Sequence, residues 1–148
     1  MANKIPGNRV INGTWGEIWL DGDKVSELTG LEAKITLKKE DVNMCGVLAK
    51  DTKITGWEGT GTIKFHKVNS RMAVKLGDNI KKGSDVRFTI LAKLADPDTR
   101  DALAERVVLK DVSFDDLTLM NFEAKALGKV ESSFTFTDYD FIDLIQPE

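Results

Sequence analysis

The sequence is poor in cysteine, in histidine and in long apolar runs. Its 148 residues include one cysteine, Cys45, and one histidine, His66. A single cysteine excludes an internal disulfide and a cysteine-based zinc cluster, and it fits a reducing compartment. No apolar stretch approaches the roughly 18 residues of a spanning helix, so we expect no membrane span. Residues 1–9 lack the apolar run of a signal peptide, and we expect the chain to remain where it is made.

The sequence also lacks an excess of basic charge. It has 21 basic and 24 acidic residues, a formal net charge of −3, whereas binding to a phosphate backbone strengthens with each phosphate neutralised. With 41% hydrophobic and 30% charged residues, the composition is that of a globular protein, and the length predicts a single domain over 1–148. The distribution of charge is uneven only at the two ends of the chain. The N-terminal arm (1–13) is basic and the C-terminal tail (138–148) is acidic, so both are candidates for contact with a neighbour.

Alternation of apolar and polar side chains predicts that most of the chain is β-strand. From Leu31 to Lys38 the odd residues are apolar and the even ones polar, and 57–66 repeats the pattern. Period two over eight residues is typical of a half-buried strand. An aromatic strand at 15–20 ends at an Asp21-Gly22 hairpin signal. Further strands are expected at 86–94, 106–114 and 127–137.

A helix and three long connections complete the expected order of elements. Residues 70–82 predict a helix capped by Ser70 and ended by Gly83, with Met72, Ala73, Leu76 and Ile80 as its apolar stripe. Residues 39–54 form a connection too long for a turn, and loops of this length are commonly functional. A polar loop begins at Asp96 with one helical turn expected before Ala104, and 117–126 shows no clear pattern. The fold class is therefore mainly β with one helix, a small β-sandwich or open barrel with the helix on its flank.

The residues assemble no catalytic, cofactor or metal site. His66 lies on the polar face of its strand, and Cys45 has no other imidazole to activate it. The pairs Asp115-Asp116 and Asp96-Pro97-Asp98 lack the spacing of a calcium loop. The glycines at 56, 59 and 61 are followed by a strand, whereas a nucleotide-binding run needs a helix. We therefore expect no enzyme, no cofactor and no metal, and we interpret the glycines as places where another strand or chain approaches closely.

Six short motifs, in this order, carry a resemblance to a known family. They are Glu40-Asp41-Val42-Asn43-Met44-Cys45-Gly46, Gly59-Thr60-Gly61-Thr62, Lys81-Lys82-Gly83-Ser84-Asp85, Glu105-Arg106-Val107, Asp111-Val112-Ser113-Phe114 and Phe134-Thr135-Phe136-Thr137-Asp138. The chain resembles the tail tube proteins of contractile phages and defective prophages, in particular the PBSX-prophage group, and the related tail-like bacteriocins. The resemblance covers roughly residues 13–140.

This resemblance implies a structural subunit that forms hexameric rings stacked into a hollow tube inside a contractile sheath. Its inner sheet, about four strands, would join a ring-shaped β-barrel. The polar strand faces would then line a wet lumen through which DNA could pass without specific binding. The lumen-facing candidates are Glu32, Lys34, Thr36, Lys38, Glu58, Thr60, Thr62, Lys64, Glu131, Ser133, Thr135 and Thr137.

Two further sets of contact residues are expected. Residues 39–54 would form the loop that stacks on the next ring, with Glu40, Asn43, Met44, Lys50 and Lys53 as its contacts. The tail would dock on a neighbouring subunit through Phe141, Ile142, Leu144 and Ile145, with its acidic residues setting the register. The implied partners are copies of the chain itself and the sheath, baseplate and tail terminator proteins. The implied location is a virion tail or tail-like particle, made in the bacterial host cytoplasm.

A small nucleic-acid-binding barrel is the alternative from another functional class. Such a barrel places aromatic side chains on one strand face, interleaved with Lys and Arg. Trp57 and Phe65 do share a strand face, but its other residues are apolar or glycine. This face is therefore more typical of a core or a subunit interface. Phage tail and bacteriocin remain open alternatives within the tube interpretation.

Overall fold

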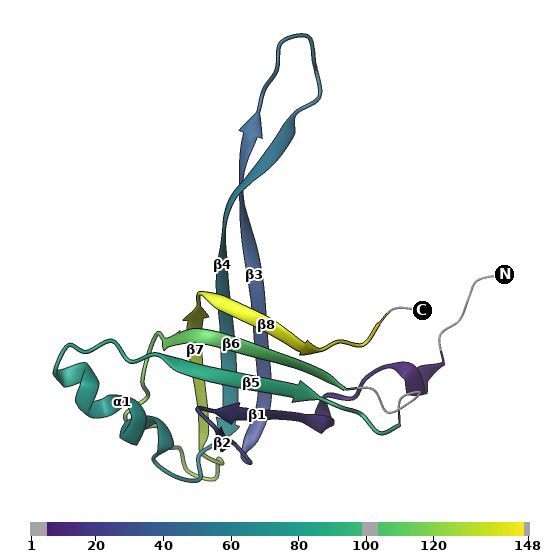
Figure 1. Ribbon diagram of the computed structural model, residues 1–148. Helices are drawn as coiled ribbons and strands as arrows, with labels where there is room; N and C mark the ends of the chain where they lie inside the picture. Colours follow the sequence, from purple (N-terminus) through teal and green to yellow (C-terminus); the bar gives the residue numbers. More distant parts are fainter. Residues whose placement is uncertain (1–5, 99–103, 147–148) are drawn as a thin grey trace.

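The computed structural model describes residues 6–98 and 104–146, and it is an antiparallel β-structure with one α-helix (Figure 1). The helical turn expected before Ala104 falls mostly on 99–103, outside the described residues. The elements are the 3₁₀ turns η1 (Gly7–Arg9) and η2 (Gly13–Trp15), β1 (Gly16–Leu20), β2 (Asp23–Lys24), β3 (Leu28–Val42), β4 (Asp51–His66), α1 (Arg71–Lys81), β5 (Phe88–Leu94), β6 (Glu105–Phe114), β7 (Lys129–Phe136) and β8 (Asp138–Asp143).

Two sheets share strand β6 and enclose the core. One sheet has the order β2-β1-β5-β6-β8, and the other consists of β3, β4 and β7 with the last residues of β6. The two sheets cross steeply, and their facing sides bury the core (Figure 1). The predicted mainly β fold with one helix is confirmed, and the sheet is not closed into a barrel within one chain. The most completely buried large side chains are Ile18, Leu20, Ile63, Ile90, Val112 and Phe134.

Strand β6 changes sheets at Asp111. Opposite it, the β5–β6 register shifts between Phe88 and Ile90, which marks a β-bulge, and Asp111 has a left-handed φ of 53°. Bulges bend a strand, and Asp tolerates this backbone region better than most residues. The Thr137 hydroxyl donates to Asp111 Oδ2 (3.1 Å), and Arg87 Nη1 donates to the Asp111 carbonyl (3.3 Å). These bonds hold the bend that lets one strand serve both sheets.

We therefore expect Asp111→Val to reduce the free energy of unfolding by about 2 kcal/mol. A β-branched residue in the left-handed region costs roughly 1–2 kcal/mol, and the bond from Thr137 is lost as well. The control is Asp111→Asn, which tolerates the same φ and keeps an acceptor, so it should cost less than about 0.5 kcal/mol. Urea unfolding of both variants measures this difference. Equal losses would mean that the bend does not depend on Asp111.

Two glycines of β4 lie directly beneath two phenylalanine rings of β7. Gly59 is paired with Phe136 and Gly61 with Phe134. A Cβ on Gly59 would lie 2.5 Å from the Phe136 ring, and a Cβ on Gly61 would lie 2.4 Å from Phe134 Cζ and 2.5 Å from the Glu32 carbonyl oxygen. The glycines therefore let the rings approach the β4 backbone closely. The close approach expected at these glycines is that of β7 in the same chain.

Helix α1 spans nearly the predicted residues, but its cap and its buried face differ from the prediction. The Asn69 side chain accepts from the Arg71 amide (3.1 Å), whereas the Ser70 side chain makes no cap bond. Met72 and Leu76 are buried, but Ala73 and Ile80 are exposed. The helix packs at one end of the two sheets (Figure 1), so only a narrow stripe of its surface is buried. Gly83, at φ 72°, ends the helix as expected.

Half of the expected long connection at 39–54 is strand. Strand β3 extends to Val42 and strand β4 begins at Asp51, and these two residues are paired. Only Asn43–Lys50 therefore lies outside the strands. The polar residues in the outer half of both strands concealed this, because neither face of that half is buried in the chain. The strand predicted at 15–20 begins one residue later than expected, because Trp15 is part of η2 and β1 starts at Gly16.

The acidic tail is also a strand of its own subunit. Residues Asp138–Asp143 form β8, which pairs with β6. Arg106 Nε lies 3.3 Å from Asp143 Oδ2, and the Lys110 ammonium contacts the Asp140 carboxylate. That hydrogen bond, with the negative charge of Asp140, raises the pKa of Lys110. Within one chain these two acidic residues align β8 with its own β6, and the expected register on a neighbouring subunit stays a prediction.

Candidate functional site: the polar sheet face and the projecting hairpin

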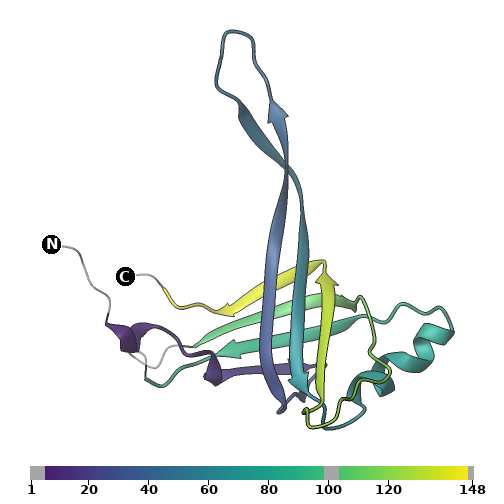
Figure 2. The same ribbon diagram turned by 180° about the vertical axis from the view of Figure 1, so that it is seen from behind.

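The outer face of the β3-β4-β7 sheet carries the predicted lumen residues in rows. Because directly paired residues of antiparallel strands point to the same side, the register places them together. Glu32, Thr62 and Ser133 form one row, and Lys34, Thr60 and Thr135 form the next. Thr36 is paired with Glu58, and Lys64 with Glu131. Seen from behind, this sheet is the nearest layer of the molecule (Figure 2). The structure thus brings eleven of the twelve candidates onto three adjacent strands.

The charges of this face are balanced. It contains three lysines and three glutamates, separated by hydroxyl side chains. Lys64 Nζ lies 3.9 Å from Glu131 Oε1, an exposed pair that leaves no net charge. Thr137 is the exception among the candidates, since it follows the end of β7 and its hydroxyl is bonded to Asp111. A neutral, hydroxyl-rich face offers a polyanion no strong electrostatic attachment.

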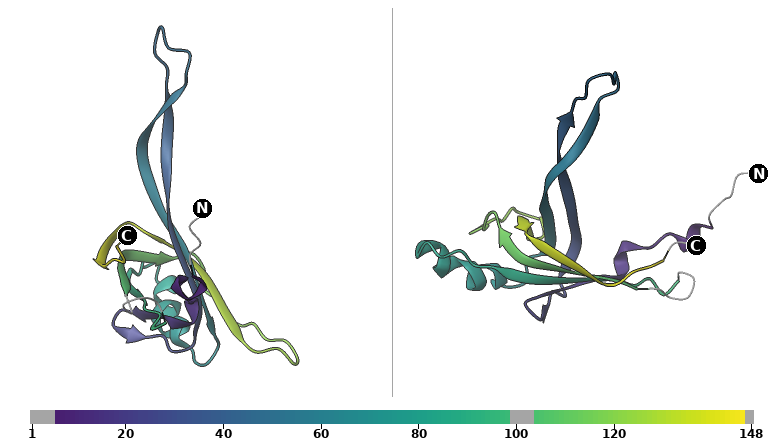
Figure 3. Two further views of the ribbon diagram at one scale, coloured as in Figure 1. Left: turned by 90° about the vertical axis from the view of Figure 1, so that its right-hand side faces the viewer. Right: turned by 45° about the horizontal axis from the view of Figure 1, so that its top comes forward.

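The hairpin of β3 and β4 projects far beyond both sheets (Figures 1 and 3). The pairing of β4 with β7 starts at Gly59, so in the described residues the part from Asp51 to Glu58 is hydrogen-bonded as a strand to β3 alone. The fifteen residues of β3 span about 50 Å. Two-stranded hairpins are at best marginally stable alone in water. This one moreover exposes apolar side chains near its tip and along its stem: Leu37, Met44, Val47, Leu48, Ile54 and Trp57.

The predicted inter-ring contact residues lie in this hairpin. Glu40 and Lys53 are paired with each other across the two strands, and Lys50 Nζ lies 3.1 Å from Asp41 Oδ2. Asn43 and Met44 are in the turn. All five predicted residues are exposed. The structure thus gathers them at one end of the molecule, where a contact with another copy would reach them first.

The four apolar tail residues are only partly covered. Phe141 and Ile142 lie on β8, and Leu144 and Ile145 follow it. Phe141, Ile142 and Leu144 are about half exposed. Phe141 packs edge-on against Tyr139 with ring centroids 5.5 Å apart, and Tyr139 packs against Trp57 at 5.7 Å. This row of aromatic rings joins β8 to the base of the hairpin, so the tail is part of the body and still presents an apolar surface.

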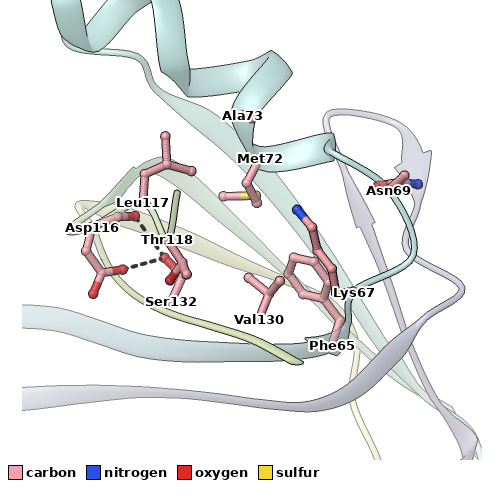
Figure 4. Close-up of a pocket in the computed structure, with 10 residues that line it drawn as sticks. All are labelled: Phe65, Lys67, Asn69, Met72, Ala73, Asp116, Leu117, Thr118, Val130 and Ser132. Carbon is pink, nitrogen blue, oxygen red and sulfur yellow. Dashed lines mark hydrogen bonds between the residues drawn. The ribbon is translucent and has the colours of Figure 1, made fainter. Parts of the chain in front are cut away.

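Sequence reasoning missed the loop between β6 and β7, Asp115–Gly128. The Ser132 hydroxyl bonds to Asp116 Oδ1 (3.0 Å) and to the Asp116 carbonyl (3.2 Å), beneath α1 (Figure 4). Its apolar side chains Leu119, Met120, Phe122 and Leu127 are nevertheless strongly exposed. Apolar residues without periodicity were the available signal, since such residues in a loop need a covering surface.

The described residues offer little for chemistry. Within 6–98 and 104–146 there is no group of three or more His, Cys, Asp or Glu side chains that could hold a metal ion. His66 is exposed at the end of β4, and Cys45 is exposed in the hairpin turn. In the same residues, no helix has both the length and the apolar character needed to cross a membrane.

Two proteins of Bacillus subtilis (strain 168) are similar to this chain over most of its length. The phage-like element PBSX protein XkdM is 36% identical over 138 residues, which is 92% of each chain. The uncharacterized protein YqbM shows the same identity and coverage. A solved protein from Bacillus subtilis is 35% identical, with a TM-score of 0.52 over 88% of this chain and 93% of that one.

Solved structures of contractile particles share the fold at low identity. The tube-terminating cap of the anti-feeding prophage matches with a TM-score of 0.72 at 12% identity, over 97% of this chain and 95% of that one. A chain from the extended sheath–tube complex of the PVC extracellular contractile injection system matches with a TM-score of 0.65 at 13% identity. The match covers 95% of this chain and 93% of that one. The family model described as phage tail tube protein matches residues 3–143. The PBSX-like resemblance is thereby confirmed, and the chain belongs to the phage tail tube protein family.

Proposed function

We propose that this tail tube subunit assembles as hexameric rings that stack into a hollow conduit. The observation that carries the proposal is the projecting hairpin, a two-stranded segment with exposed apolar side chains that one chain alone leaves uncovered. An open sheet has free edges, and ring closure removes them. Six copies, each giving β3, β4, β7 and the end of β6, would make a barrel roughly 50 Å across for strands ~4.8 Å apart tilted near 45°.

In this assembly the balanced polar face lines the lumen. The opposite face of the same sheet holds Ile63, Phe65 and Phe134 in the core, so only the polar face is available to the channel. Its mixture of Lys, Glu and hydroxyl side chains would let a polyanion pass without binding to one place. The same reasoning applies whether the particle is a phage tail that delivers DNA or a bacteriocin.

The hairpin provides the axial contact between rings. Its tip carries Met44, Val47 and Leu48 between charged residues such as Asp41 and Lys50. Burial of these side chains against the next ring would supply the hydrophobic free energy of stacking, at about 25 cal/mol per Å². The charged residues around them would fix the orientation of one ring on the next.

We infer that the partners are copies of this chain together with sheath, baseplate and terminator proteins. The similar folds found in a sheath–tube complex and in a tube-terminating cap support this. The role is structural rather than enzymatic, in a virion tail or tail-like particle, with the subunit made in the host cytoplasm. Family membership favours this function over the nucleic-acid-binding barrel.

Electron microscopy of the purified chain, combined with cysteine labelling, tests the proposal. We expect rings or tubes with a central channel. In a Cys45→Ser background, cysteines at Thr60, Thr62 and Thr135 should react in the tube with a small thiol reagent and be protected from one too large for the channel. The control is Val74→Cys on α1, an exposed position that both reagents should reach. Equal labelling of all positions by both reagents would place the polar face outside.

A further inference from the structure

We propose that the β6–β7 loop of one subunit docks into a groove on the next subunit of the same ring. The loop, Asp115–Gly128, is called the docking loop here. The groove lies between β3 and the ends of β1, β5 and β6, and it is called the lateral groove. This inference rests on the proposed ring, and it names the residues that would hold neighbouring subunits together.

The docking loop is fixed at both ends and apolar in the middle. At its start the Asp115 amide donates to the Ser133 carbonyl (2.8 Å), and Asp116 accepts from the buried Ser132. At its end the Lys67 amide donates to the Gly128 carbonyl (2.8 Å). Between these anchors, Leu119 and Phe122 are each 83% exposed. A loop held in place at both ends, with large apolar side chains in water, is a preformed contact surface rather than a loose connection.

The lateral groove has the shape and the chemistry to receive these side chains. It is an open cavity of about 540 Å³. Its walls are mostly apolar and include Ile18, Leu28, Leu31, Ala92, Leu94 and Val107. Thr29, on the β3 wall, is exposed, so the groove is open along this strand. Concave apolar sites with a few polar groups at the rim are the usual receptors for apolar side chains.

The loop and the groove lie on opposite sides of one subunit. Figure 2 shows β3 at one side of the sheet and β7, with the loop that precedes it, at the other. A contact between them must therefore join two copies. Such a contact is head-to-tail, and head-to-tail contacts close into rings when the rotation per subunit allows it. If the sheet continues from β3 of one copy to the β6–β7 side of the next, the loop is brought beside the groove.

A second copy is the occupant that the molecule itself favours. Both halves of the contact are present on every chain, so a ring of identical subunits covers all loops and all grooves at once. A sheath or baseplate protein on the loop would leave the grooves open. The second copy also places the loop next to β3, which pairs only with β4 among the described strands and has a free edge.

Three variants test the two sides of the contact and the specificity of the effect. Leu119→Ser with Phe122→Ser removes the apolar side chains of the loop, and Thr29→Trp narrows the groove from an exposed position on its wall. Both should leave the thermal unfolding of the free subunit unchanged and reduce ring and tube formation at least about tenfold. Val74→Ser is the matched control, since Val74 is 82% exposed on α1 and far from the groove. Assembly of the loop variant at the normal level would overturn the inference.

Cross-linking identifies the occupant directly. In a Cys45→Ser background, Thr29→Cys beside the groove and Phe122→Cys in the loop should form disulfides that yield a ladder from dimer to hexamer. Each single variant should give no ladder. Rings without cross-links, or cross-links within one chain only, would overturn this docking while leaving the tube function intact. If the parent chain formed no rings or tubes, the proposed function itself would fail.

Discussion

Replacing the hairpin tip with a short turn should give a folded subunit that forms no long tubes. Val42 and Asp51 are paired, so Asn43–Lys50 can be replaced by Asn-Gly, which closes a hairpin between such partners. The change removes Met44, Val47 and Leu48, the apolar side chains at the tip, and leaves both sheets untouched. Electron microscopy and sedimentation should show single rings or short stacks. We expect the largest effect on assembly from this change.

The control for the tip replacement keeps its length. Lys50→Gln with Lys53→Gln removes two charges and retains the apolar tip, and exposed charges contribute only about 0–1 kcal/mol each. This variant should form tubes of nearly normal length, with a weaker dependence on salt. Unchanged unfolding of the shortened subunit shows that it remains folded. Long tubes from the shortened subunit would disprove the stacking role of the hairpin.

Gly61→Ala is expected to be the most destabilising single methyl substitution in the chain. The added Cβ would lie 2.4 Å from Phe134 Cζ and 2.5 Å from the Glu32 carbonyl oxygen, and Phe134 is fully buried. Overpacking a core costs about 1–3 kcal/mol, and here the β3 backbone must also move. We expect a loss near 3 kcal/mol, which for a chain of this size lowers Tm by about 10 °C. Differential scanning calorimetry measures it.

Two neighbouring glycines provide graded controls for this effect. A Cβ on Gly56 meets no atom within 4 Å, so Gly56→Ala should be neutral or slightly stabilising. The three atoms nearest to a Cβ on Gly59 all belong to the Phe136 ring. The smaller Phe136→Leu side chain should therefore partly restore the stability of Gly59→Ala. Phe134→Leu should not restore Gly61→Ala, because the carbonyl of Glu32 remains in place. Similar losses for all three alanine variants would show that strand propensity, not contact, decides.

The sequence was sufficient to predict the elements that one subunit stabilises by itself. Alternation at 57–66 reflects a strand with one face in the core, and the Asp21-Gly22 turn and the Gly83 helix end are local signals. The polar rows of the sheet followed from the same alternation. Such patterns arise where the buried and exposed sides of a strand differ within a single chain.

The elements that were misjudged are those whose environment is incomplete in one chain. The outer hairpin has no core side, so its strands from Lys39 to Val42 and from Asp51 to Ile54 carry no clear alternation. Residues 138–148 were interpreted as a tail that docks on a neighbouring subunit, and the pairing of β8 within its own chain was missed because it depends on Arg106 and Lys110 far away in the sequence. The docking loop had no pattern at all. Its apolar side chains have no periodicity because no regular element presents them.

The two-stranded part of the hairpin gives the free subunit two levels of stability. The sheets share a core and open only when the whole domain unfolds. The outer part of the hairpin, Asp51 to Thr55 with its β3 partners, is held by a single ladder and is mostly exposed to water. Such segments open locally at a small fraction of the global free energy. Part of the conformational entropy of the hairpin would therefore be lost only when a neighbouring subunit covers it and fixes its conformation. In the proposed tube, free subunits would then associate weakly with one another and strongly with an already ordered end, so growth would proceed from an existing template.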